Sequence, residues 1–283
     1  MRTTVIVVLV LATAAPMTAQ SPQTTFRSGI DVVELDVSVT RGGVPVAGLT
    51  SRDFELTDNR TRQDVESVTL ERVPLNVSIV LDVSQSVAGE RLEQMVQAGD
   101  ALADALRPAE RVSLITFSHS VSQTLPLTTD VTSFRAALKT IVPGGSTSLR
   151  DAAHLALLTA SREGGRPLIL LFTDGHDTTS WLTSSAVIDS ARRSGIVMHV
   201  VRFERDAFLD HLVDATGGRT WSATSNRQLR ELFTHALDEM RARYLLTYTP
   251  KVAPVPGWHD LKVRLRNGSA DVIARPGYFV AAR

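Results

Sequence analysis

Two kinds of hydrophobic pattern divide this chain. Between residues 30 and 73, apolar and polar side chains alternate with period two, for example at Val33, Leu35, Val37 and Val39. This period predicts antiparallel strands with one buried face. The same period returns in short runs after Arg243. Because four strands of this kind would be marginally stable alone, we expect them to pair with the N-terminal strands in one antiparallel β part.

Between these two segments, continuous apolar runs alternate with helical periods. Residues 75–81, 168–172 and 196–201 are dominated by Val, Ile and Leu, which is typical of parallel strands buried on both faces. Apolar positions at helical spacing recur over 92–106 and 229–240. The alternation predicts an α/β fold with a doubly wound, mostly parallel central sheet and helices on both faces. We expect this unit to be inserted in the smaller antiparallel β part.

The first residues have the pattern of a secretory signal. Arg2 is basic, residues 5–15 are apolar, and Ala19 is a small residue where cleavage could occur. The apolar stretch is shorter than the ~20 residues that span a bilayer. We therefore predict a secreted or periplasmic protein without stable membrane insertion after signal cleavage. The predicted segments are a signal peptide at 1–19, an N-terminal β segment at 20–73, the α/β unit at 74–242 and a C-terminal β segment at 243–283.

Composition narrows the possible partners. Thirty Lys and Arg balance thirty Asp and Glu, so net charge provides no attraction to nucleic acid. The chain contains no cysteine, which excludes disulfides and a lipid-modified N-terminal cysteine. The seven histidines show no H-x-x-x-H spacing, so we do not expect a zinc site.

Oxygen-bearing side chains follow the apolar runs at three places. Asp82, Ser84 and Ser86 form D-x-S-x-S after the first buried run, Thr147 lies in Gly-Ser-Thr before a helical period, and Asp174 follows the second buried run. Ligands of parallel sheets bind outside the carboxyl ends of the strands. Mg²⁺ prefers oxygen ligands and usually retains water. These five residues therefore predict a metal site with one position open to an incoming carboxylate.

Together, the three segments resemble the von Willebrand factor A domain and its metal-ion-dependent adhesion site, over roughly residues 74–240. The resemblance implies Mg²⁺ or Mn²⁺ held by Asp82, Ser84, Ser86, Thr147 and Asp174. It also implies a protein partner that presents an Asp or Glu to the metal, with a shift of the last helix, residues 226–241, sometimes coupled to binding. The flanking segments 44–54 and 243–248 are similar to those of exported bacterial proteins with related domains.

Each of these positions also has a purely local interpretation. Asp82 could end a strand while Ser84 and Ser86 make turn hydrogen bonds. Thr147 precedes a sequence with capping-box spacing, residues 148–151, and Asp174 begins a common turn dipeptide. We assign Asp151 to the first turn of a helix rather than to the metal. His176 and Asp177 flank the site and could either contact a partner or remain solvated.

Two other functions compete with an adhesion or scaffold module. A metal-dependent hydrolase of the phosphoaspartyl kind would need a second carboxylate two residues after Asp82, where the chain has Ser84. No G-x-S-x-G elbow, nucleotide-binding loop or evident base accompanies the ligands. The other alternative is a structural β-rich scaffold with a vestigial site. We predict a metal-dependent protein-binding module that is not an enzyme.

Overall fold

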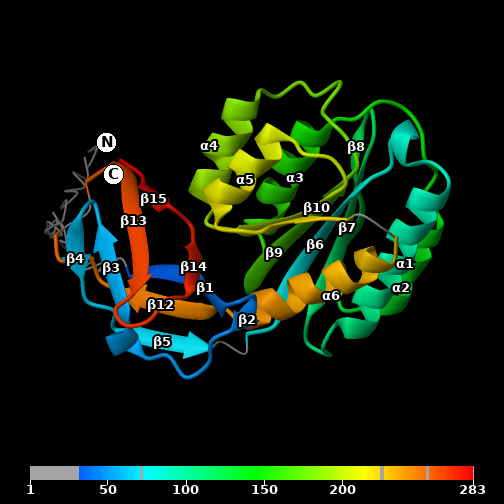
Figure 1. Cartoon of the computed structure of the whole chain (residues 1–283). Coiled ribbons are helices and arrows are strands. Elements are labelled where there is room, and N and C mark those ends of the chain that lie inside the picture. The colour runs from blue at the N-terminus through cyan, green and yellow to red at the C-terminus, as the bar shows by residue number, and fades with distance from the viewer. Residues whose placement is uncertain (1–31, 71–72, 224–225, 253–254, 283) are drawn as a thin grey trace, which may run out of the picture. The chain divides into compact units, whose positions relative to one another are not determined.

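The strands of the protein form three sheets in the computed structural model (Figure 1), which describes residues 32–70, 73–223, 226–252 and 255–282. The predicted signal peptide at 1–19 lies outside these residues. Within them, no helix is both long and apolar enough to cross a membrane.

The central sheet has six strands in the order β11-β10-β9-β6-β7-β8. All neighbours are parallel except β8, which runs antiparallel to β7 at the edge. Every residue of β6 and nearly every residue of β9 is buried, as the apolar runs predict. The strands are β6 (Leu75–Asp82), β7 (Arg111–Phe117), β8 (Val121–Thr128), β9 (Arg166–Thr173), β10 (Val197–Arg202) and β11 (Thr220–Ser222).

Helices cover both faces of this sheet. One hydrophobic cluster joins one face to α1 (Glu90–Ala105), α2 (Val131–Lys139) and α6 (Asn226–Arg241). The opposite face packs on α3 (Leu149–Ala160), α4 (Ser184–Ser194) and α5 (Ala207–Thr216). The predicted doubly wound α/β fold is therefore confirmed.

The remaining strands form two antiparallel sheets that share one core. One sheet has the order β14-β1-β12-β5, with β2 beside β1, and the other has the order β15-β13-β3-β4. Side chains from both sheets, including Leu35, Phe54 and Tyr244, form a separate buried cluster. The strands are β1 (Val33–Arg41), β2 (Val44–Pro45), β3 (Phe54–Asp58), β4 (Thr61–Gln63), β5 (Ser67–Leu70), β12 (Tyr244–Tyr248), β13 (Gly257–Leu265), β14 (Asp271–Ala274) and β15 (Gly277–Val280).

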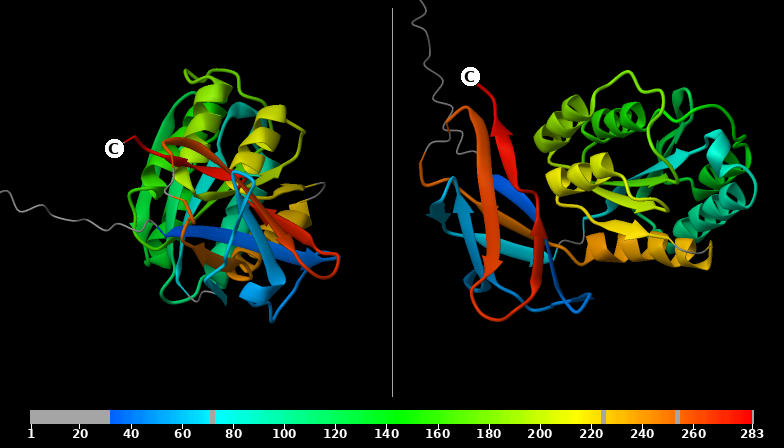
Figure 2. Two further views of the ribbon diagram at one scale, coloured as in Figure 1. Left: turned by 90° about the vertical axis from the view of Figure 1, so that its left-hand side faces the viewer. Right: turned by 45° about the horizontal axis from the view of Figure 1, so that its top comes forward.

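Strands from the two ends of the sequence lie side by side in these sheets (Figure 2). β1 pairs with both β12 and β14, and β13 pairs with β3. β5 and β12 are also antiparallel neighbours, with Leu70 opposite Tyr244. The chain thus leaves one strand for the α/β unit and returns on the adjacent strand. The expected insertion between two β segments that pair with each other is confirmed.

Some element boundaries differ from what the sequence pattern predicts. Alternation over residues 44–49 predicts a strand, but β2 contains only Val44–Pro45, and β4 is an additional strand. Apolar spacing predicts a short helix around residues 134–141. The helix instead begins at Val131, because Asp130 caps it by accepting hydrogen bonds from the backbone N–H groups of Thr132 and Ser133.

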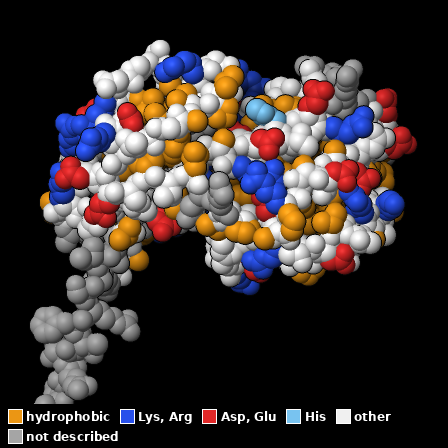
Figure 3. Space-filling view, turned by 90° about the horizontal axis from the view of Figure 1, so that it is seen from below, with side chains coloured by type: hydrophobic (Ala, Val, Ile, Leu, Met, Phe, Trp, Pro, Cys, Tyr) orange, Lys and Arg blue, Asp and Glu red, His pale blue; other side chains and the backbone are white. Residues whose placement is uncertain are grey.

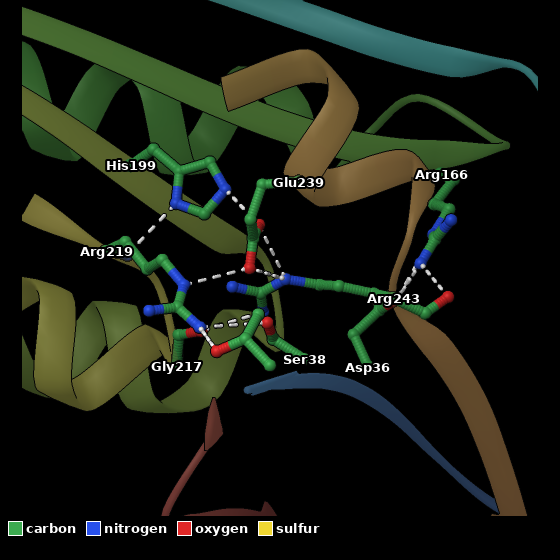
Figure 4. A network of polar contacts seen from close by, with 9 residues as sticks. Asp36, Ser38, Arg166, His199, Gly217, Arg219, Glu239 and Arg243 are labelled. Carbon is green, nitrogen blue, oxygen red and sulfur yellow. Dashed lines mark hydrogen bonds and ion pairs between the residues drawn. The ribbon is translucent and has the colours of Figure 1, made fainter. Parts of the chain in front are cut away.

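A buried ionic network forms where α6 ends (Figure 4). Glu239 accepts hydrogen bonds from Nε of Arg243 at 3.0 Å and from Nε of Arg219 at 3.2 Å. Nδ1 of His199 accepts the backbone N–H of Arg219, so its ring proton is on Nε2, which lies 2.9 Å from Glu239. Burial would raise the pKa of the Glu239 carboxyl, but Arg243 and His199 outweigh it and hold that pKa far below its usual value.

The same network reaches strand β1. Nη2 of Arg219 donates to the hydroxyls of Ser38 at 3.1 Å and Thr40 at 3.3 Å. Arg166, at the start of β9, forms an ion pair with Asp36 and also donates to the carbonyl oxygen of Arg243 (Figure 4). Charged side chains of the α/β unit therefore have partners on a strand of the β part.

Candidate metal centre

Two neighbouring strands of the central sheet end at the predicted site. β6 ends at Asp82 and β9 ends at Thr173, and Leu81 of β6 pairs with Phe172 of β9. Asp82 follows Leu81 and Thr173 follows Phe172, so Asp82 and Thr173 lie side by side at the carboxyl edge of the sheet. Hydroxyl and carboxylate oxygens gather at this edge as the sequence predicts.

Asp82 is completely buried, and protein groups meet both of its oxygens. Oδ1 accepts hydrogen bonds from the backbone N–H of Ser84 at 2.9 Å and from its hydroxyl at 2.6 Å. Oδ2 accepts one from the hydroxyl of Thr173 at 2.7 Å. These bonds fix the carboxylate and turn the Ser84 hydroxyl toward it.

A row of closely spaced oxygens continues from Ser84 to Asp174. The hydroxyls of Ser84 and Ser86 lie 3.0 Å apart, and the Ser86 hydroxyl donates to Oδ1 of Asp174 at 2.9 Å. Ser84 precedes a short 3-10 helix, η2 (Gln85–Val87), which presents Ser86, two residues later, on the exposed side. The structure thus brings together four of the five predicted ligands, Asp82, Ser84, Ser86 and Asp174.

Thr147 lies in the loop before α3, and backbone bonds hold this loop to its two neighbours. The N–H of Gln85 donates to the carbonyl of Gly145 at 3.0 Å, and the N–H of Thr178 donates to the carbonyl of Thr147 at 2.9 Å. Gly145 has a φ of +79°, and a Cβ there would meet Nδ1 of His119 at 2.3 Å. The close packing of this loop therefore requires glycine, and Thr147 is held, buried, between the segments that carry the other four residues.

Residues 177–182 are fastened to the first turn of α3. Asp177 accepts hydrogen bonds from the backbone N–H of Arg150 at 3.0 Å and from its guanidinium at 2.7 Å. Ser180 also accepts the N–H of Arg150, at 3.1 Å, and Asp151 accepts the N–H of Leu182 at 3.0 Å. Although Ser148 is the N-cap of α3, its side chain makes no capping bond.

The structure shows where the polar residues near the site, Asp151, His176 and Asp177, lie. Asp151 lies in the first turn of α3, as predicted, and Asp177 fastens the loop rather than facing solvent. Burial would raise the pKa of the Asp177 carboxyl, but hydrogen bonds from Arg150 and Ser180 outweigh it and lower that pKa. His176 remains exposed and pairs with Asp206, with 2.7 Å between Nδ1 and Oδ2.

The residues present fit a divalent cation. Burial raises the pKa of the Asp82 carboxyl, and the nearby Asp174 adds to this, while hydrogen bonds from Ser84 and Thr173 oppose it. A cation at this edge would reverse that electrostatic cost because it favours ionised carboxylates. Hydroxyls can also rotate from donating to accepting, so Ser84 and Ser86 can serve as oxygen ligands. The candidate site differs from a metal site built mainly of charged ligands, because it combines two carboxylates with hydroxyls. No group of three or more His, Cys, Asp or Glu that could hold a metal ion occurs among the described residues.

Two contacts at the site escaped the sequence analysis. Thr173, the residue before Asp174, donates a hydrogen bond from its hydroxyl to Asp82. Arg91, the second residue of α1, donates from Nη1 to Oδ2 of Asp174 at 2.5 Å, and its guanidinium carbon lies 5.0 Å from the ring centre of Phe203. Asp174 and Arg91 are 83 positions apart, and no local sequence pattern links them.

Comparison with known proteins agrees with this architecture. Residues 77–176, which include all five predicted ligands, match the family model described as von Willebrand factor type A domain. The α/β unit has the von Willebrand factor A fold. A solved von Willebrand factor type A protein from Catenulispora acidiphila superposes with a TM-score of 0.53 and 12% sequence identity, covering 83% of this chain and 75% of that one.

Two further proteins resemble parts of the chain. The PilB minor pilin from Streptococcus sanguinis superposes with a TM-score of 0.51 and 14% identity, over 61% of this chain and 62% of the pilin. Inter-alpha-trypsin inhibitor heavy chain H2 of Mesocricetus auratus is 29% identical over 138 residues, which cover 44% of this chain. The matched region spans only 15% of that heavy chain's own length. At this low sequence identity, the two solved structures show a shared fold and do not indicate a shared function.

Proposed function

We propose that the protein is an exported adhesion or scaffold module that binds a protein partner through a divalent cation. In this proposal Asp82, Ser84, Ser86, Thr147 and Asp174 hold Mg²⁺ or Mn²⁺, and an Asp or Glu of the partner completes the coordination. The observation that carries it is the row of closely spaced oxygens from Asp82 through Ser84 and Ser86 to Asp174 at one edge of the sheet. The bound cation would supply a strong attraction for a carboxylate.

The comparisons give this proposal a context. The von Willebrand factor A fold is shared with a minor pilin, whose name places it in a surface appendage. Positive and negative side chains are interspersed on the face shown in Figure 3, in keeping with the net charge of zero. A cation at the site, rather than a field of one sign, would then select an acidic partner. The proposed export rests on the signal-like pattern of residues 1–19.

The neighbours of the predicted ligands support a non-catalytic role in this proposal. Thr173, Ser84 and Ser86 donate hydrogen bonds to the carboxylates, and Arg91 pairs with Asp174. His119, which lies close to the loop that carries Thr147, contacts Ser118, with 3.3 Å between Nδ1 and the hydroxyl oxygen. These contacts favour a binding site over the hydrolase alternative.

The test is affinity capture from a cell-envelope extract, with the protein immobilised and washed in Mg²⁺ or in EDTA. We expect a partner that is retained in Mg²⁺ and released by EDTA, and we expect Asp82→Ala to lose it. Asp189→Ala is the matched control because Asp189 is an exposed acid on α4 that pairs with Arg192 of the same helix. Capture by Asp82→Ala equal to that by the wild type in Mg²⁺ would refute the proposal.

A further inference from the structure

Arg91 brings a positive charge of the protein itself to the predicted metal site. Its guanidinium donates to Oδ2 of Asp174, whose side chain is 1% exposed, while the Arg91 side chain is 44% exposed. The other oxygen of Asp174 accepts the Ser86 hydroxyl. Both oxygens of Asp174 therefore have partners. One partner is a hydroxyl that can rotate, and the other is a guanidinium that is always positively charged.

The two contacts of Asp174 differ in what a metal ion would do to them. The Ser86 hydroxyl can turn its lone pairs toward a cation and remain in the site. The Arg91 guanidinium has only donors and keeps its charge at any ordinary pH, so it cannot become a ligand. A divalent cation near Asp174 would repel it. The ring of Phe203 beside the guanidinium supports its present position.

We propose that Arg91 competes with the divalent cation for Asp174. It holds the carboxylate when no metal is bound, lowers the affinity of the site for Mg²⁺, and leaves Asp174 when the metal enters. Because the Arg91 side chain already reaches solvent, its release requires no opening of the core. This inference rests on the metal site of the proposed function.

The direct test is calorimetric titration of the protein with MgCl₂ and with MnCl₂. Arg91→Gln removes the charge but keeps a polar side chain, and we expect metal to bind roughly two- to fivefold more tightly, the range for a partly exposed ion pair. Arg91→Lys retains the charge and should bind close to the wild type. Arg135→Gln is the matched control because Arg135 is a similarly exposed arginine that pairs with Asp100 and Asp104 of α1.

Thermal unfolding provides a second readout that a merely structural role would not produce. In EDTA, Arg91→Gln should unfold at a lower temperature than the wild type, because Asp174 has lost its counter-charge. In saturating Mg²⁺ this difference should shrink, because the metal then neutralises Asp174. An equal deficit in both buffers, together with unchanged metal affinity, would overturn the inference while leaving the metal site standing. If neither the wild type nor Arg91→Gln binds either metal, both the inference and the proposed function fail.

Discussion

Asp82 and Asp58 are both buried carboxylates at the last position of a strand, yet their surroundings differ. Asp58, at the end of β3, accepts hydrogen bonds from the hydroxyls of Tyr248 at 3.0 Å and Tyr278 at 2.9 Å. Its other oxygen lies 2.9 Å from Nδ1 of His259. These partners stand on strands of the β part.

The partners of Asp82 belong to the loop after β6 and the last position of β9, and they lead through Ser84 to the exposed Ser86. The contacts of Asp58 thus come from the aromatic side chains of Tyr248, Tyr278 and His259. The contacts of Asp82 instead lead to the surface through serine hydroxyls, which can change hydrogen-bond partners. The comparison teaches that burial of an acid does not identify a binding site. What distinguishes the candidate metal centre is the kind of group that satisfies the acid.

The largest loss of stability is expected at Glu239, whose ionic partners His199 and Arg243 are completely buried. Glu239→Gln removes the negative charge beside Arg243, whose side chain is fully buried, and should lower the free energy of unfolding by about 3–5 kcal/mol, the range for breaking a buried pair. Urea unfolding measures this loss, with the exposed Glu93→Gln on α1 as control. A loss below about 1 kcal/mol, the range of a surface ion pair, would show that water reaches this network and that it does not behave as buried.

The next effect tests the Asp58 cluster. Asp58→Ala leaves two tyrosine hydroxyls and His259 without their acceptor, so we expect a loss of about 3 kcal/mol, the upper end for buried groups left unpaired. The loss should be the same in Mg²⁺ and in EDTA. Asp64→Ala, at an exposed acid of the same β part, is the control. A loss that depended on Mg²⁺ would end the distinction between the two acids.

Asp82→Ala should behave in the opposite way. For the wild type, Mg²⁺ at 100 times its Kd should raise the free energy of unfolding by about 2.7 kcal/mol, and the variant should gain nothing. In EDTA the variant should also lose stability, because Ser84 and Thr173 lose their acceptor, but removal of the buried carboxyl, whose pKa burial raises, offsets part of that loss. Thermal scans with and without Mg²⁺ measure both differences. Equal stabilisation of wild type and variant by Mg²⁺ contradicts the assigned ligand.

The smallest effect concerns pH. Burial would lower the pKa of His259, but bonds to the carbonyl of Val255 and to Asp58 outweigh it and raise that pKa in the folded protein. Its stabilising contribution is therefore complete below about pH 6.5, the unfolded value, and is lost as pH rises through the folded pKa. We expect the wild type to lose stability relative to His259→Gln between pH 6 and pH 9, measured by urea unfolding. A constant difference across this range would show that His259 is neutral in the cluster.

The fold could be predicted where the sequence carries a local period. Residues 75–81 fall within β6, and residues 168–172 fall within β9, because strands buried on both faces must be apolar throughout. Boundaries that depend on side-chain caps were harder. The start of α2 depends on Asp130, whose capping bonds are not visible in the hydrophobic period.

The candidate site was predictable for a similar reason. Asp82 and Asp174 follow apolar strands, and adjacent parallel strands bring their carboxyl ends to one edge. Contacts such as Arg91 with Asp174, or Asp177 with Arg150, join residues 83 and 27 positions apart and depend on how helices pack on the sheet. No period or spacing in the sequence encodes those contacts, so they required the structure.

The pairing of Leu70 with Tyr244 has a practical consequence for protein engineering. The α/β unit occupies the place that the turn of a β5–β12 hairpin would fill, since these antiparallel strands are neighbours. A two-residue Asn-Gly turn could connect their facing ends directly. The β part then becomes a miniature scaffold, into which other domains could be grafted at the same junction provided that their own first and last residues lie about one strand spacing apart.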